Sequence, residues 1–136
     1  MALSTTKVGI VSCSGEELPG GTVTRVAARL VLEKLRPDKT VTICLPLFLA
    51  GETEEHGFAK EHPTIAVDGC GKLCAKKAIT KYSKEPAAGV DVEALLKEWG
   101  VESPKNRRVL DAKELKEARR LAELLAAKVD EIREAA

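Results

Sequence analysis

The four cysteines of this sequence are the residues with the clearest potential for chemistry. Cys70 and Cys74 stand four positions apart, after an apolar run and an Asp-Gly pair. Cys13 and Cys44 each stand at or near the end of another strand-like run. Thiolates bind Zn²⁺, and they also act as nucleophiles and redox groups. We therefore interpret the four thiols as ligands that converge on one metal ion.

The spacing of the cysteines leaves several kinds of thiol chemistry open. Cys70 and Cys74 would share one face at the start of a helix and reach a common point. The spacing is not that of a zinc finger, because the only close pair is C-x3-C. An interpretation of Cys13 and Cys44 as small buried side chains fits equally well. A redox or persulfide-handling enzyme that uses Cys13 or the Cys70/Cys74 pair is an alternative, as is an iron–sulfur cluster on the four thiols.

The elements that would position these thiols alternate between strands and helices. Short apolar or β-branched runs predict strands at residues 7–13, 40–45, 65–67 and 87–91. Apolar residues at spacings of three and four predict helices at residues 22–36, 75–83, 92–99 and from 111 onward, with a shorter helix at 52–62. This alternation predicts a three-layer, Rossmann-like α/β fold, in which a short parallel sheet of about four strands is flanked by helices and a long C-terminal helix. We expect a single domain, residues 1–136.

Two of the predicted helices carry specific start signals. Thr22 is the predicted N-cap of the first helix. Asp111, followed three residues later by Glu114, predicts a capping box at the start of the C-terminal helix. Apolar residues along that helix predict one buried seam, formed by Leu115, Ala118, Ala122, Leu125, Val129 and Ile132.

The predicted topology places the thiols at one edge of the sheet. The carboxyl ends of parallel strands share an edge, and sites form there. If the first strand lies between the second and third, as in the common doubly wound order, Cys13, Cys44 and Cys70 meet at that edge. Adjacent strands are about 4.8 Å apart and the thiolates of a zinc site about 3.8 Å apart, so small adjustments suffice. Cys74 would supply the fourth ligand from the first turn of a helix.

Asp68 follows the apolar run of the third strand, where a carboxylate is costly unless it is hydrogen-bonded. We expect it either to accept backbone N–H bonds around the thiolates or to act as an ordinary helix cap or turn former. Both roles are structural. The sequence identifies no catalytic residue, and the loop after the first strand matches neither common nucleotide-binding motif.

The composition excludes several functional classes. The formal net charge is +1 and aromatic residues make up 3%, whereas nucleic-acid binders show a basic excess or stacking aromatics. No apolar run reaches the length of a membrane span, and the first residues lack the core of a signal peptide. We therefore expect a cytoplasmic protein without nucleic-acid or membrane partners, and its protein partners stay unknown. In that reducing compartment, cysteines favour metal or redox chemistry over disulfides.

The segments around the cysteines resemble a known family. Asp68-Gly69-Cys70, followed by Leu73-Cys74-Ala75-Lys76-Lys77-Ala78, resembles the DGC-domain family of zinc-binding proteins from bacteria and archaea, which is named for that tripeptide. Ser12-Cys13-Ser14-Gly15 is similar to the family's opening Cys-Ser-Gly motif, and Cys44 falls where the family has a cysteine after its second strand. The resemblance covers about residues 7–92. It implies one zinc ion held by Cys13, Cys44, Cys70 and Cys74 in a structural or regulatory role, and it implies no reaction.

One position departs from the family pattern. Many members read Cys-Ser-Gly-Cys, whereas this chain has Glu16 at the fourth position. A carboxylate can bind zinc, but we interpret Glu16 as a solvated loop residue. The four cysteines are then the whole predicted ligand set.

Overall fold

The computed structural model describes residues 6–15, 18–105 and 109–136 of the chain. The centre of this described part is a sheet of four parallel strands in the order β2-β1-β3-β4. In this register Ile10 of β1 pairs with Thr42 of β2 on one side and with Ile65 of β3 on the other. The strands are β1 (Val8–Ser12), β2 (Thr40–Thr42), β3 (Thr64–Asp68) and β4 (Ala88–Asp91).

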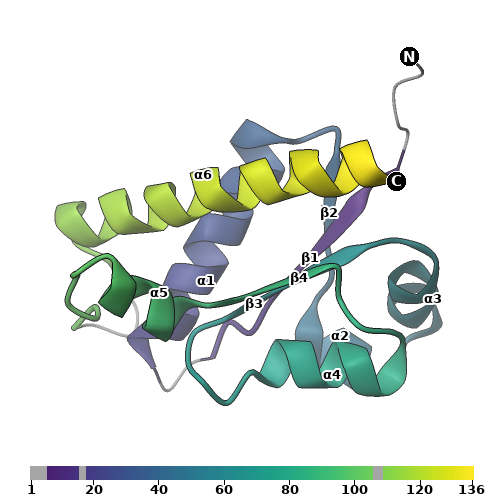
Figure 1. Cartoon of the computed structure of the whole chain (residues 1–136). Helices are drawn as coiled ribbons and strands as arrows, with labels where there is room; N and C mark the ends of the chain where they lie inside the picture. The colour runs from purple at the N-terminus through teal and green to yellow at the C-terminus, as the bar shows by residue number, and fades with distance from the viewer. Residues whose placement is uncertain (1–5, 16–17, 106–108) are drawn as a thin grey trace.

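Helices cover both faces of the sheet and produce three layers (Figure 1). One face carries α1 (Pro19–Leu30), which continues as the π-helical turn η1 (Val31–Leu35), together with α5 (Val92–Glu98) and the long helix α6 (Ala112–Ala135). The other face carries α2 (Leu45–Leu49), α3 (Thr53–Glu61) and α4 (Cys74–Tyr82). The predicted α/β fold, with its parallel sheet and long C-terminal helix, is confirmed.

Alternate residues of the strands belong to two separate hydrophobic cores. Ile10 and Ile65 pack with apolar residues of α1, α5 and α6, whereas Val11 and Ala66 pack with residues of α2, α3 and α4. Successive side chains of a strand point to opposite faces, so a sheet covered on both faces must be apolar at successive positions. This requirement explains why the strands read as nearly continuous apolar runs.

The first helix begins earlier than the sequence predicted. Its first residue is Pro19, its N-cap is Leu18, and the predicted cap Thr22 lies buried inside the helix. Proline suits the first position of a helix, because that position has no intrahelical acceptor for an N–H and proline's φ is already helical. The proline was the better start signal than the threonine.

The second strand is shorter than predicted, because a helix with proline in its first turn begins soon after it. It ends at Thr42 rather than at residue 45, and α2 begins at Leu45 with Pro46 in its first turn. Cys44, predicted near the end of a strand, is the N-cap of this short helix. The helix α2 was not among the predicted elements.

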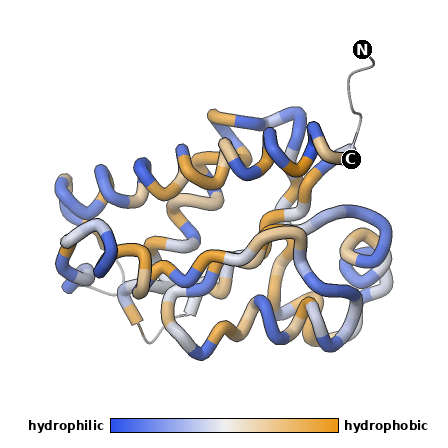
Figure 2. Tube along the Cα trace, in the orientation of Figure 1, coloured by the Kyte–Doolittle hydropathy of each residue, from blue (hydrophilic) through white to orange (hydrophobic). Residues whose placement is uncertain are grey.

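The C-terminal helix begins as predicted, but its buried face begins about one turn later than the predicted seam. Asp111 and Glu114 form the capping box. Leu115, predicted in the seam, is 47% exposed, because the contacts of α6 with the core begin at Ala118. The buried residues of α6 are Ala118, Leu121, Ala122, Leu125, Ala126 and Val129. Figure 2 shows hydrophilic and hydrophobic residues interleaved along α6, as expected of a helix with one buried face.

Within the described part of the chain, no helix combines the length and the apolar character that crossing a membrane requires.

Candidate metal centre

The four cysteines follow three of the strands at the carboxyl edge of the sheet. Cys13 directly follows β1, and Cys44 is the residue before α2. Cys70 lies in the turn after β3, and Cys74 is the first residue of α4. Because β1 lies between β2 and β3, the loop of Cys13 lies between the other two loops. The strand order on which the predicted site depends is therefore confirmed.

The side chains of the four cysteines differ in burial. Cys13 and Cys70 are half-buried, whereas Cys44 and Cys74 are exposed. Cys44 is thus not a small buried core residue, and Cys13 packs at the rim of the core beneath α2, α3 and α4. Across residues 6–15, 18–105 and 109–136, no three His, Cys, Asp or Glu side chains are gathered closely enough to hold a metal ion. Glu16 lies outside the described residues.

Cys13 is connected directly to the turn that bears Cys70. The backbone N–H of Gly69 donates a hydrogen bond to the Cys13 sulfur, with an N–S distance of 3.3 Å. The backbone N–H of Cys13 donates to the carbonyl of Val67 at 2.9 Å, which extends the pairing of β1 with β3 by one residue. The loops after β1 and β3 are therefore fixed relative to each other at the position of this sulfur.

Thr24 of α1 holds the other side of the Cys13 loop. Its hydroxyl is fully buried, donates to the carbonyl of Gly21 at 2.6 Å, and accepts the backbone N–H of Ser14 at 3.2 Å. The Thr24 oxygen lies 3.8 Å from the Cys13 sulfur. Because a hydroxyl has one hydrogen and this one is directed to Gly21, Thr24 acts only as an acceptor toward the thiol. Ser14 has a φ of +50°, so this N–H bond also supports a left-handed backbone conformation.

Glycines allow the start of α1 to contact both loops through the backbone alone. A Cβ added at Gly20 would lie 2.5 Å from the carbonyl oxygen of Gly69, and one added at Gly69 would lie 2.6 Å from the carbonyl carbon of Gly20. A Cβ added at Gly21 would lie 2.0 Å from the carbonyl oxygen of Gly15. Real side chains do not fit at such distances, so glycine is required at these contacts.

Asp68 acts as a cap for α4 from six residues before the first residue of the helix. Its two carboxylate oxygens accept the backbone N–H groups of Ala75 at 2.7 Å and Lys76 at 3.2 Å. The N-cap position itself is occupied by Leu73, which has a φ of +54° and no side-chain cap bond. Burial raises the pKa of the Asp68 carboxyl above its ordinary value, while the two N–H donors act in the opposite direction. Of the two predicted roles, the structure therefore shows the helix cap.

Thr24, Gly20 and Gly69 were given no part in the site by the sequence analysis. The adjacent glycines Gly20 and Gly21, in the first turn of α1, were the available signal, because glycine permits close backbone approach. Thr24 left no such signal, since its partners Cys13 and Ser14 lie 11 and 10 residues earlier in the chain.

Comparisons with known proteins place the chain in a family. Searches of curated proteins and of solved structures found no match. The family model for the DGC domain matches residues 9–129, which cover most of the chain and include all four cysteines. The match supports a metal-binding protein with several cysteines. The chain belongs to the DGC domain family.

Proposed function

We propose that this protein binds one zinc ion through the thiolates of Cys13, Cys44, Cys70 and Cys74, in a structural or regulatory role. The observation that carries the proposal is the bond from the Gly69 N–H to the Cys13 sulfur. It joins the loops after β1 and β3 at the edge where Cys44 also lies. The donor set fits the ion, because four thiolates form a common tetrahedral zinc site.

Binding would require the exposed thiols to turn towards the half-buried ones. Cys44 and Cys74 are exposed; Cys44 is the N-cap of α2, and Cys74 is the first residue of α4. A cysteine side chain has a single rotatable bond before its sulfur, so this rotation costs little conformational entropy. The two exposed thiols would also give the ion access to the site.

The surroundings favour the charge that such a site carries. Zinc with four thiolates has a net charge of about −2. The N-terminal end of α4, which begins at Cys74, carries partial positive charge. Lys72, Lys76 and Lys77 are exposed in the same turn and helix and offset the negative charge further.

A site closed by four thiolates supports a structural or regulatory role rather than catalysis by zinc. It leaves no coordination position for water or substrate. Zinc would link the loops after β1, β2 and β3, and its binding free energy would add to the stability of the fold.

Metal analysis of the purified protein and of four single Cys→Ser variants tests this proposal. We expect about one zinc per wild-type chain, and a large loss of zinc in each variant. Chelation should lower the melting temperature of the wild type. Thr80→Ser is a matched control, because it also alters one exposed side chain on α4 but removes no sulfur. A wild-type protein that contains no zinc and is indifferent to chelators would contradict the proposal.

A thiol enzyme is the second candidate, and the environment of Cys13 is the observation that favours it. Cys13 is half-buried and receives a backbone N–H, as a thiol held in place for reaction would be. In this alternative Cys13, or the Cys70/Cys74 pair, performs redox or persulfide chemistry.

Alkylation of each thiol, followed by mass spectrometry, separates the two functions. A zinc site predicts four slow thiols that become reactive together after chelation. A thiol enzyme predicts that one thiol is alkylated rapidly while any metal is retained. An absorption spectrum of protein prepared without oxygen would identify an iron–sulfur cluster on the same thiols.

A further inference from the structure

The two exposed cysteines of the proposed zinc site depend on helices for their positions. Cys44 is the N-cap of α2, and Cys74 is the first residue of α4. The N–H groups in the first turn of α4 are bound by Asp68, as described above. The helix α2 has only five residues, and a helix that short is not stable without contacts from other elements. The contacts that hold α2 therefore decide where Cys44 lies.

His56, a half-buried residue of α3, makes such a contact with the end of α2. Its Nε2 atom lies 2.6 Å from the backbone carbonyl oxygen of Phe48. A carbonyl oxygen only accepts hydrogen bonds, so Nε2 carries the hydrogen and donates it. The last carbonyls of a helix have no donor within the helix, and that of Phe48 also accepts the N–H of Gly51 at 3.1 Å. His56 thus connects the carboxyl end of α2 to α3.

Phe48 links this bond to Cys44. The backbone N–H of Phe48 donates to the carbonyl of Cys44 at 2.9 Å, which closes the first turn of α2. Its side chain is fully buried in the core formed with α3 and α4. Two consecutive hydrogen bonds, from His56 to Phe48 and from Phe48 to Cys44, therefore lead from α3 to the backbone of a proposed zinc ligand.

The ring of His56 also connects α2 with α4. Its centroid lies 4.5 Å from that of Phe48 and 5.9 Å from that of Tyr82, on which it stacks with an interplanar angle of 27°. Tyr82 is the last residue of α4, the helix that begins at Cys74. Figure 1 shows α2, α3 and α4 together on one side of the sheet. His56 therefore contacts both helices that bear the exposed thiols.

We infer that His56 is a positioning residue for the zinc site, an inference that rests on the proposed function. It acts through the hydrogen bond from its Nε2 atom to Phe48, which holds α2 and so places Cys44. Without that bond α2 is less ordered, and zinc binding must order it at the expense of affinity. Groups that orient the ligands of a metal site typically change its affinity tenfold or more.

Three variants test this role through the zinc affinity, measured by competition with a chromophoric chelator. His56→Phe keeps a planar ring without a donor and should bind zinc about tenfold more weakly. The amide nitrogen of His56→Gln can occupy nearly the position of Nε2, so this variant should stay close to wild-type affinity. His56→Asn is one carbon shorter, does not reach Phe48, and should lose as much affinity as His56→Phe. Glutamine and asparagine both lack the ring, so their difference isolates the hydrogen bond.

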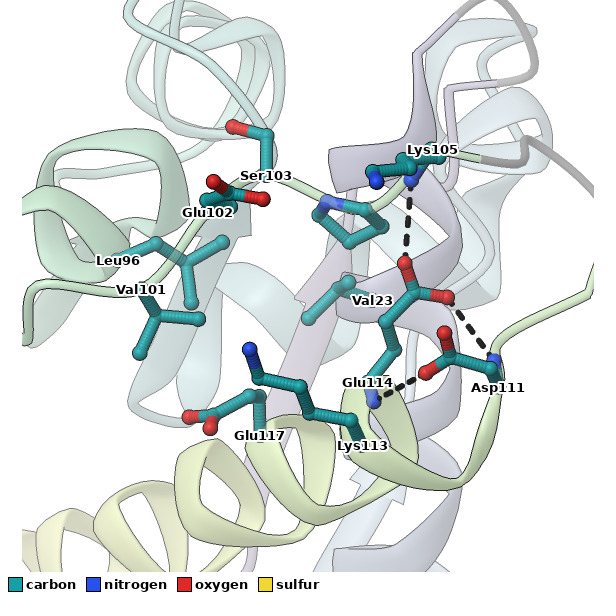
Figure 3. Close-up of a pocket in the computed structure, with 11 residues that line it drawn as sticks. Val23, Leu96, Val101, Glu102, Ser103, Lys105, Asp111, Lys113, Glu114 and Glu117 are labelled. Carbon is teal, nitrogen blue, oxygen red and sulfur yellow. Dashed lines mark hydrogen bonds between the residues drawn. The ribbon is translucent and has the colours of Figure 1, made fainter.

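Hydrogen exchange of the metal-free protein gives a second readout that does not depend on zinc. The Phe48 amide closes the first turn of α2, and it should exchange about tenfold faster in His56→Phe than in the wild type. The amides of β1 and β3 report global unfolding and should change less. Those of Glu114 and Lys105 belong to the other face of the sheet, where they donate to the carboxylates of Asp111 and Glu114 (Figure 3), and they should not change.

His62→Phe is the matched control. His62 is also half-buried and belongs to the end of α3, but its ring stacks on Phe58 of its own helix, with centroids 4.3 Å apart, rather than on α2. This variant should keep wild-type zinc affinity.

Wild-type zinc affinity in His56→Phe, or an affinity of His56→Gln as low as that of His56→Asn, would overturn the inference and leave the proposed function intact. Equal acceleration of exchange at Phe48 and in β1 and β3 would also overturn it, because His56 would then only stabilise the fold as a whole. A wild-type protein that binds no zinc would overturn the proposed function and this inference together.

Discussion

Gly69 takes part in two separate contacts, a close backbone contact with Gly20 and a hydrogen bond to Cys13. Its backbone contacts that of Gly20 too closely for a side chain on either residue. Its N–H donates to the sulfur of Cys13. Asp68 before it caps α4, and Cys70 after it is a proposed zinc ligand. The tripeptide that gives the family its name thus combines a helix cap, a backbone contact and a thiol in three consecutive residues.

Gly69→Ala should destabilise the protein by about 1–3 kcal/mol, because the added methyl forces α1 and the turn apart. Urea unfolding measures this difference. Gly57→Ala is the control: its added Cβ meets nothing within 4 Å. Gly57 lies inside α3, where alanine should stabilise by about 0.5–1 kcal/mol. If both variants shifted stability in the same direction, the steric argument for Gly69 would be wrong.

Thr24→Val should cost about 1–3 kcal/mol, because the half-buried N–H of Ser14 and the carbonyl of Gly21 would lose their hydrogen bonds to the threonine hydroxyl. Valine has nearly the shape of threonine, so the loss reflects hydrogen bonds rather than volume. We also expect weaker zinc binding, measured by competition with a chromophoric chelator, since the Cys13 loop is no longer held. Thr24→Ser retains the hydroxyl and should keep wild-type zinc affinity. Equal zinc affinities of the serine and valine variants would show that Thr24 does not position Cys13.

At the scale of elements, local signals predicted where most helices and strands lie. The capping box of α6 follows from two residues three positions apart, and it was predicted correctly. The starts of α1 and α2 were missed because Pro19 was assigned to a loop and Pro46 to the end of the second strand, whereas both lie in the first turn of a helix. The exposed position of Leu115 was missed because periodicity does not reveal where the core that a helix contacts begins.

Asp111→Ala should destabilise the protein by about 1 kcal/mol, through loss of the cap that starts α6. The capping box has a second consequence, because Glu114 also binds the N–H of Lys105. The variant should therefore loosen the segment 101–105, which hydrogen exchange of the Lys105 amide would report. Lys116→Ala, at an exposed position of the same helix, is the control. An unchanged melting temperature would mean that packing alone maintains the first turn of α6.

At the scale of the molecule, strand order was predictable and side-chain convergence was not. Alternating strands and helices predict a parallel sheet, and the common doubly wound order places β1 between β2 and β3. The structure has this order, which brings three cysteine loops to one edge. The orientation of each sulfur depends on contacts between residues far apart in the chain, such as Gly69 with Cys13 across 56 positions. Patterns of composition and spacing do not encode such contacts. The zinc site therefore stays a prediction, whereas the edge on which it depends is established.

Arg36 and Asp130 connect two distant parts of the chain across 94 positions. Arg36 follows η1, and its guanidinium donates two hydrogen bonds to the carboxylate of Asp130 on α6, at 2.9 and 2.7 Å. Such a bidentate pair is stronger than a single contact. The pair is partly exposed, with the Asp130 side chain 39% accessible, so solvent screens it. We expect it to contribute about 0.5–1 kcal/mol at neutral pH.

The pH dependence of this contribution has a defined sign. The hydrogen bonds from Arg36 lower the pKa of Asp130 below its ordinary value of 3.8. The unfolded chain therefore takes up this proton at a higher pH than the folded protein does, and stability falls as the pH drops from about 4 through the lowered pKa. Above that window the contribution is fully present.

Asp130→Asn should therefore be less stable than the wild type at pH 7 and at pH 5, by about 0.5–1 kcal/mol. The difference should shrink below about pH 4, because protonated aspartic acid resembles asparagine in charge. Urea midpoints at pH 7, 5 and 3 provide the measurement. Glu123→Gln is the control, since its pair with Arg119 is 3.7 Å long and more than 60% exposed on both sides, and no change in stability is expected. A difference for Asp130→Asn that stayed constant down to pH 3 would show that the asparagine acts through packing and not through the lost charge.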